Sequence, residues 1–104
     1  MDIVYSFPNT EKAKAMSIVE GDKFGPLAFA TRGFVQKDGT DYGLPGKTLL
    51  IIRNVSEEFK KEADLKLKEV VGLEVLPQEK TSEIVKRVNE EEEAAQSGFG
   101  SIFG

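Results

Sequence analysis

The sequence contains no cysteine and no histidine among its 104 residues. Without cysteine, the chain can form no disulfide, no thiolate zinc site and no thiol nucleophile. Without histidine, it also lacks the side chain that most often transfers protons and binds transition metals near neutral pH. These two absences exclude much of enzyme chemistry. We therefore expect no metal site and no cofactor, and we identify no catalytic residue.

Long apolar runs and clusters of basic residues are also missing. The longest aliphatic run, Leu49 to Ile52, is far too short to cross a membrane, and no basic stretch followed by an apolar one opens the sequence. Lysine and arginine number 14 against 18 aspartate and glutamate residues, and proteins that bind phosphate backbones concentrate positive charge. We therefore expect a soluble, cytoplasmic protein that contacts neither nucleic acid nor membrane directly.

The length suits one globular domain, because 104 residues with 39% hydrophobic side chains can build one core but not two. The composition changes near Asn89, where the acidic run Glu90 to Glu93 gives way to a segment rich in glycine, serine and phenylalanine. We predict a single α+β domain over residues 1–89 and a flexible acidic tail over residues 90–104.

Hydrophobic periodicity and capping residues predict the secondary structure. The predicted order is strand 2–7, helix 10–21, strand 27–36 bent at Gly33, strand 48–55, a helix from Ser56, strand 70–76, and a helix from Thr81 or Ser82 with Ile84, Val85 and Val88 on one side. If the last helix continues, Glu91 and Glu92 fall on the same side as its apolar residues.

This order resembles the ferredoxin-like fold, a split β-α-β sandwich of a four-stranded antiparallel sheet and two packed helices, here with an extra C-terminal helix. The first and third strands should be central, because Leu49 to Ile52 is apolar on both faces. One layer of two helices covers only one sheet face. Either the last helix covers the other face, or the aliphatic side chains there meet a ligand, a partner or a second copy, and we favour an open face that docks.

A glycine-rich loop over residues 38–48 is the candidate for a small-ligand site. Its polar side chains include Asp38, Asp41, Lys47 and Thr48, and loops beside a rigid sheet commonly carry binding sites. The ending Gly46-Lys47-Thr48 resembles the end of a P-loop, but a P-loop leads into a helix and this segment leads into a predicted strand. The loop is therefore interpreted as a turn, with an anion or metabolite site as the alternative.

The segment over residues 96–104 is the most informative part of the sequence. Phe99, Ile102 and Phe103 stand among glycine and serine after four consecutive glutamates, and such apolar side chains suit anchoring on a partner. The spacing of Gln96, Phe99, Ile102 and Phe103 is similar to the short peptide with which replication and repair proteins dock on DNA sliding clamps. The family pattern prefers Leu, Ile or Met where Phe99 stands, and an aromatic pair where Ile102 and Phe103 stand.

From these features we predict a small non-catalytic protein-interaction or assembly module. It would dock through its open sheet face and its aromatic tail, on another protein or on a second copy of itself. A small-ligand-binding regulatory domain that uses loop 38–48 is the alternative, and a sliding-clamp-binding accessory protein is a weaker one. An enzyme that depends on paired carboxylates is the least favoured interpretation.

Overall fold

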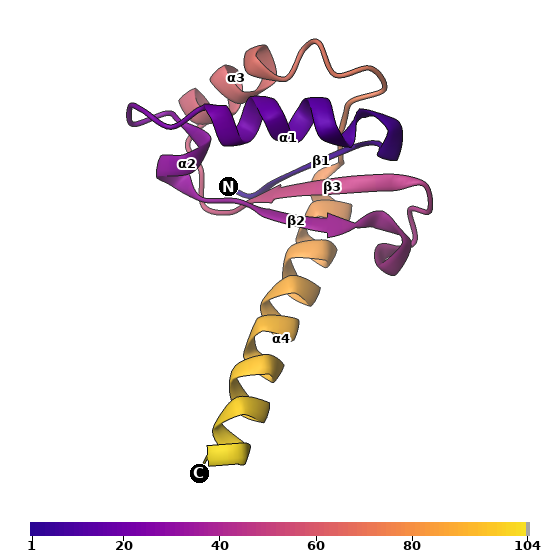
Figure 1. Cartoon of the computed structure of the whole chain (residues 1–104), viewed down its shortest axis with the longest axis vertical. Helices are drawn as coiled ribbons and strands as arrows, with labels where there is room; N and C mark the ends of the chain where they lie inside the picture. The colour runs from indigo at the N-terminus through magenta and orange to yellow at the C-terminus, as the bar shows by residue number, and fades with distance from the viewer. Residues whose placement is uncertain (104) are drawn as a thin grey trace.

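The computed structural model describes the backbone of residues 1–103 and the side chains of residues 1–95. Four strands form one antiparallel sheet in the order β2-β3-β1-β4, and helices lie on both of its faces (Figure 1). The strands are β1 Ile3–Pro8, β2 Val35–Asp38, β3 Lys47–Ile52 and β4 Glu74–Val75, the helices are α1 Lys12–Gly21, α2 Phe29–Arg32, α3 Glu57–Lys66 and α4 Gln78–Phe103, and the short 3-10 helices are η1 Asn9–Glu11 and η2 Gly39–Tyr42.

The two central strands are β1 and β3, as the sequence predicts. They pair from Ile3 opposite Ile52 to Pro8 opposite Lys47, while β2 pairs with the outer edge of β3 and β4 with the outer edge of β1. The mixed α+β class with a four-stranded antiparallel sheet is therefore confirmed. Nothing in the strand order or directions conflicts with the ferredoxin-like arrangement, which stays a prediction.

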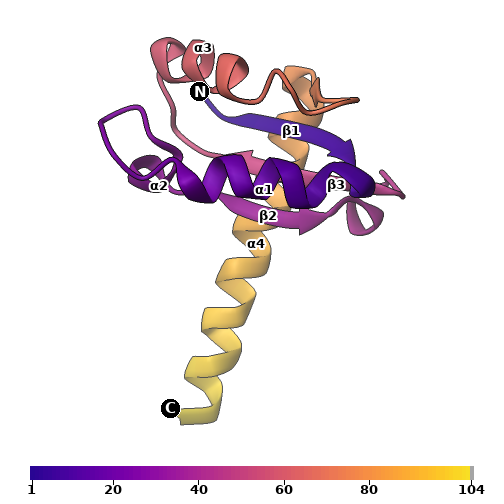
Figure 2. The same cartoon turned by 45° about the horizontal axis from the view of Figure 1, so that its top comes forward.

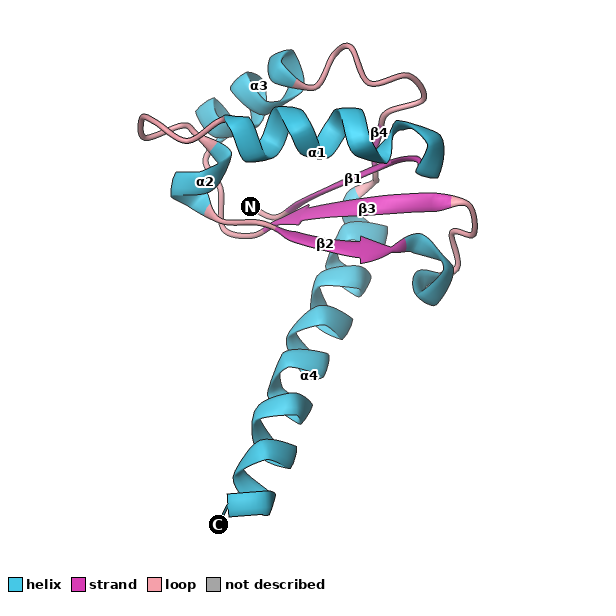
Figure 3. Ribbon diagram, viewed as in Figure 1, coloured by secondary structure: helices cyan, strands magenta, loops and turns pink. Residues whose placement is uncertain are grey.

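The first sheet face is covered by α1 and α3, with the short α2 at one end (Figure 3). Alternation along β1 turns Ile3, Tyr5 and Phe7 toward this layer, where none is more than 2% exposed. Helix α3 begins where the sequence predicts, because the Ser56 hydroxyl accepts a hydrogen bond from the amide of Phe59 at 3.1 Å. This face carries the larger of the two hydrophobic cores.

The second sheet face is covered by the first half of α4, which crosses the sheet on the side opposite α1 and α3 (Figures 1 and 2). Val4, Leu49 and Ile51 are fully buried on this face. The α4 side chains that pack against them are Ile84, Val85 and Val88. The prediction of an open sheet face is therefore wrong over these residues, because the apolar side of the last helix covers it.

Residues 27–36 do not form the single bent strand that the sequence predicts. Helix α2 occupies the middle of the segment, Gly33 then has a φ of 83°, and only β2 pairs with β3. The carboxylate of Asp22 accepts a hydrogen bond from the Phe29 amide at 3.0 Å, and the Phe29 ring is fully buried. These tertiary contacts favour a helical turn over the extended backbone that the composition predicts.

The fourth strand is also shorter than predicted. Only Glu74–Val75 pair with β1, because the chain between α3 and β4 turns, with Gly72 at a φ of 77° and a hydrogen bond of 3.0 Å from the Val70 amide to the Leu67 carbonyl. A glycine at positive φ permits this turn, which a continuous strand would not contain.

Helix α4 starts earlier than the sequence predicts, and it continues past the predicted domain boundary. It begins at Gln78, directly after Pro77, and its backbone remains helical to Phe103, so that the predicted boundary at Asn89 falls inside the helix. Its second half extends away from the sheet (Figure 1). No helix among residues 1–103 combines the length and the apolar character needed to cross a bilayer.

Candidate functional site

Polar side chains gather where α4 leaves the sheet, around Val88, the last buried residue of this helix among the side chains described. We call this group the α4 collar. Its members are Lys37, Tyr42 and Arg53 from the sheet and its loops, and Arg87, Asn89, Glu91 and Glu92 from α4. The collar joins elements that lie far apart in the sequence, and it is the last set of described contacts between α4 and the rest of the chain.

On one side of the collar, Glu91 binds Tyr42 and Lys37. The Tyr42 hydroxyl donates to the Glu91 carboxylate, whose two oxygens lie 2.9 and 3.0 Å away, and the Lys37 ammonium is 3.4 Å from Glu91 Oε2. The Arg87 guanidinium lies 4.5 Å from the centre of the Tyr42 ring and donates to the Asp41 carbonyl at 2.7 Å. Burial, the hydrogen bond to Glu91 and its negative charge raise the pKa of Tyr42 to about 12.

On the other side, Arg53 binds Asn89 and Glu92. Its guanidinium donates to Asn89 Oδ1 at 2.7 Å and to the two Glu92 oxygens at 3.0 and 3.1 Å, the paired geometry that arginine forms best. Hydrogen bonding between the two charged groups raises the pKa of Arg53 and lowers that of Glu92. The expectation that Glu91 and Glu92 lie on the apolar side of the helix is confirmed, and both carboxylates have partners there.

Beyond the collar, α4 no longer lies on the sheet. We call residues 93–103 the α4 arm. Its first side chains, Glu93, Ala94 and Ala95, are exposed. The predicted partner-binding residues Gln96, Phe99, Ile102 and Phe103 belong to the arm, but their side chains lie outside the described residues. Their backbone is helical and continues α4 from the collar.

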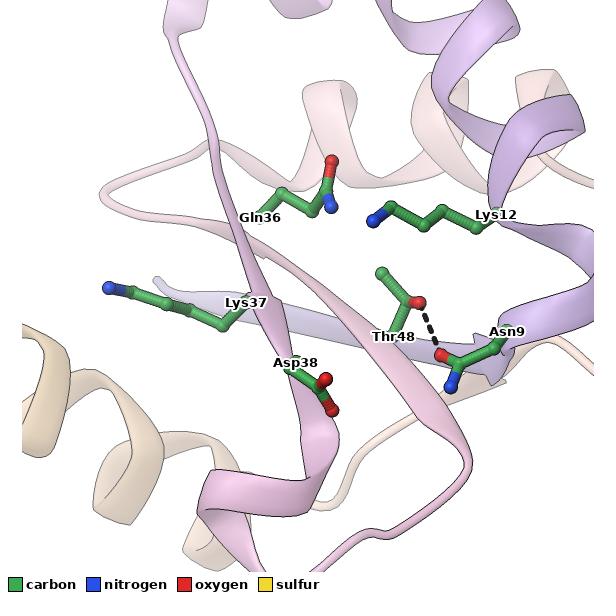
Figure 4. Close-up of a pocket in the computed structure, with 6 residues that line it drawn as sticks. All are labelled: Asn9, Lys12, Gln36, Lys37, Asp38 and Thr48. Atoms are coloured by element: carbon green, nitrogen blue, oxygen red, sulfur yellow. Dashed lines mark hydrogen bonds between the residues drawn. The ribbon is translucent and has the colours of Figure 1, made fainter.

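The predicted ligand-binding loop contributes two of its four candidate residues to a surface hollow of about 330 Å³ (Figure 4). Asp38 and Thr48 line this hollow, whereas Asp41 and Lys47 do not. The other lining residues are Asn9, Lys12, Gln36 and Lys37. The Gly46-Lys47-Thr48 segment runs into β3, as the sequence predicts, so it has no helix N-terminus with which to bind phosphate.

The polar groups of the hollow are held by local hydrogen bonds. Asp38 accepts from the Thr40 amide at 2.9 Å, which is the main cause of its lowered pKa. The buried Thr48 hydroxyl donates to Asn9 Oδ1 at 2.7 Å, which leaves the Asn9 amide nitrogen as a donor. Figure 4 shows Lys12 pointing toward Gln36. The hollow therefore combines one ammonium, one carboxylate and two amides, a set that suits a small polar ligand.

Sequence reasoning missed Asn9, Lys12 and Gln36 because they lie on other elements. Asn9 and Lys12 follow β1, and only the pairing of β1 with β3 brings them beside Thr48. The signal that could have found them is the predicted central position of both strands, which places the end of the first beside the start of the third. Lys37 also lines the hollow, but its side chain points away from it, toward α4 (Figure 4).

Among the side chains described, no three acidic residues come together in a way that could hold a metal ion. In comparisons with known proteins, no family model, no curated protein and no solved structure matches the chain.

Proposed function

We propose that this chain is a small, non-catalytic, cytoplasmic interaction module that docks through the α4 arm, either on a partner protein or on a second copy of itself. The observation that carries the proposal is the departure of α4 from the sheet at the collar (Figure 2). The sheet face is not part of the docking surface, because α4 covers it.

A helix that leaves its domain is well placed to enter a groove on another protein. At about 1.5 Å per residue, the arm is roughly 16 Å long. Its sequence carries Phe99, Ile102 and Phe103, at i, i+3 and i+4, the spacing with which one side of a helix presents apolar groups. Isolated helices of this length are marginal in water, and a partner that buries this side would stabilise the arm.

The test compares the full chain with the double variant Phe99→Ala/Phe103→Ala. The matched control is Ser82→Ala/Lys86→Ala, which changes two exposed α4 residues outside the arm. We expect binding of a purified sliding clamp, measured by calorimetry, to be lost in the phenylalanine variant and retained in the control. Self-association through the arm, measured by light scattering, should weaken in the phenylalanine variant and not in the control. A monomeric full chain that binds no clamp, and from which cross-linking in cell extract recovers no protein dependent on these two residues, contradicts the proposal.

The hollow beside loop 38–48 supports a second candidate function, the binding of a small polar ligand. Lys12 would pair with an anionic group of the ligand and Asp38 with a cationic one, which favours a small ligand that bears both charges. Inorganic phosphate, acetate and free amino acids are suitable probes. A probe that binds should raise the melting temperature of the full chain, and Lys12→Gln should abolish this shift while Lys14→Gln retains it. No shift with any small anion or zwitterion excludes this candidate.

A further inference from the structure

One apolar side chain lies almost entirely in water. Phe24 is 92% exposed, more than any other large apolar side chain among the described residues. It belongs to the loop over residues 22–28, which connects α1 to α2 and extends beyond the end of α1 (Figure 1). A phenylalanine in this position loses the burial that normally stabilises it, and exposed aromatic side chains frequently mark interfaces.

The loop that carries Phe24 is fixed at both ends. The Asp22 carboxylate accepts from the Phe29 amide at 3.0 Å and from the Lys66 ammonium at 2.8 Å, and Lys66 also donates to the Leu27 carbonyl at 2.9 Å. Burial opposes ionisation of Asp22, but these hydrogen bonds and the Lys66 charge outweigh it and lower the pKa of Asp22. These contacts hold both ends of the loop, and the loop therefore presents Phe24 in a defined position.

The turn next to Phe24 has its own hydrogen bonds. The Gly25 carbonyl accepts from the Ala28 amide at 3.3 Å and from the Thr31 hydroxyl at 2.8 Å. Gly25 has a φ of 97°, which glycine adopts without strain, and Pro26 follows it with a fixed φ. Little conformational entropy remains to be lost when such a loop binds, so its aromatic group suits an anchor.

Beside the base of this loop lies a shallow hollow of about 290 Å³, lined by Ile18, Gly21, Asp22 and Lys66. A protein cavity of roughly 150 Å³ can hold a benzene ring, so this hollow has room for one phenyl group. The glycine at position 21 leaves it open, since a Cβ added there would meet no atom within 4 Å. The charges of Asp22 and Lys66 are paired with each other, so an entering ring would leave neither charge without a partner.

We propose that Phe24 anchors a twofold-symmetric contact between two copies of this chain, in which each Phe24 ring enters the hollow of the other copy. A protruding group and a matching hollow on one surface are what a self-complementary twofold interface requires. Each ring buries roughly 150 to 250 Å² when it is covered, and both rings are covered at once. This contact uses the opposite end of α1 from the ligand hollow and does not involve the α4 arm, so it is independent of the proposed function.

The test is the molar mass of the full chain in solution, measured by sedimentation equilibrium from about 10 µM to about 1 mM. We expect a monomer–dimer equilibrium whose dissociation constant rises about tenfold or more in Phe24→Ser. Gly21→Leu should have the same effect, because position 21 lines the hollow and a larger side chain there would occupy it; the added Cβ itself meets no atom within 4 Å. Val71→Ser is the control: Val71 is 69% exposed, and its amide binds Glu11 at the other end of α1.

Three outcomes overturn the proposal. The first is a chain that remains a monomer of 11.5 kDa over the whole concentration range. The second is a dimer that persists unchanged in both Phe24→Ser and Gly21→Leu. The third is a dimer that Val71→Ser weakens as much as Phe24→Ser. Phe99→Ala/Phe103→Ala should leave this dimer intact, and a dimer that disappears only in that double variant belongs to the α4 arm instead.

Discussion

At the scale of single residues, the two tyrosines show how burial and a carboxylate partner act together. The Tyr5 hydroxyl donates to Asp64 at 2.7 Å, and the Tyr42 hydroxyl donates to Glu91. The two side chains are 0% and 4% exposed. Burial is the largest cause of the raised pKa of each, because it disfavours a phenolate, and the neighbouring carboxylate adds to the effect.

These raised pKa values predict alkaline unfolding. In the unfolded chain both tyrosines release their protons near pH 10, whereas in the folded chain Tyr42 releases its proton only at about pH 12. A raised folded-state pKa contributes stability that is complete below pH 10 and is lost as the pH rises toward 12. With two tyrosines and no tryptophan, tyrosinate absorbance reports these groups alone. We expect it to appear together with the loss of helical circular dichroism. A tyrosine that ionises near pH 10 in the still-folded chain contradicts this account.

At the scale of elements, the local sequence predicted those that carry their own signal, a capping residue or a regular alternation of apolar side chains. The Ser56 cap and the apolar side of the helix that follows identify α3, and the alternation of Ile3, Tyr5 and Phe7 identifies β1. Helix α2 was missed, because the contacts that stabilise it come from Asp22 and from the core around Phe29. The periodicity of apolar residues indicates which side of an element is buried, but not which other element contacts that side.

Apolar packing contributes more to the docking of α4 than the ion pairs of the collar do. The Val88 side chain is fully buried, with 0% of its surface exposed to water. The Glu92 side chain is 47% exposed, so solvent screens its ion pair with Arg53. We expect Val88→Ala to lower the free energy of unfolding by about 1 to 3 kcal/mol, from lost burial and a residual cavity. Glu92→Gln should cost less, and 1 M salt should change the stability little. Urea unfolding measures both variants, and a larger loss for Glu92→Gln contradicts this ranking.

At the scale of the whole molecule, the sequence identified some residues of each candidate site but not the distant residues that contact them in the fold. It selected Asp38 and Thr48, and it placed Glu91 and Glu92 on the inner side of a continued helix. The residues that bind those two glutamates, 49 positions away for Tyr42 and 39 for Arg53, could not be selected, because only the folded sheet brings them to α4. The open sheet face was expected although the sequence places Ile84, Val85 and Val88 on one side of the last helix, because that pattern does not show which surface this side of the helix covers.

The collar also defines where the packed domain ends. Every described contact of α4 with the sheet lies at or before Glu92, so a chain ending at residue 95 should keep the stability of the full chain. A chain ending at Asn89 lacks Glu91 and Glu92, and it leaves the Tyr42 hydroxyl and the Arg53 guanidinium without these partners. Loss of the hydrogen bond between the part-buried Tyr42 hydroxyl and a charged carboxylate costs about 1 to 3 kcal/mol, so this shorter chain should melt at a lower temperature.

Thermal unfolding of the three chains at a few micromolar, followed by circular dichroism, separates two descriptions of the arm. If residues 96–104 serve only a partner, their removal leaves the melting temperature unchanged at this dilution, because no intermolecular contact is populated. If the chain ending at residue 95 melts as low as the chain ending at Asn89, the removed segment packs on its own domain. The arm would then stabilise the fold and would not be available for docking, and the proposed function would lose its basis.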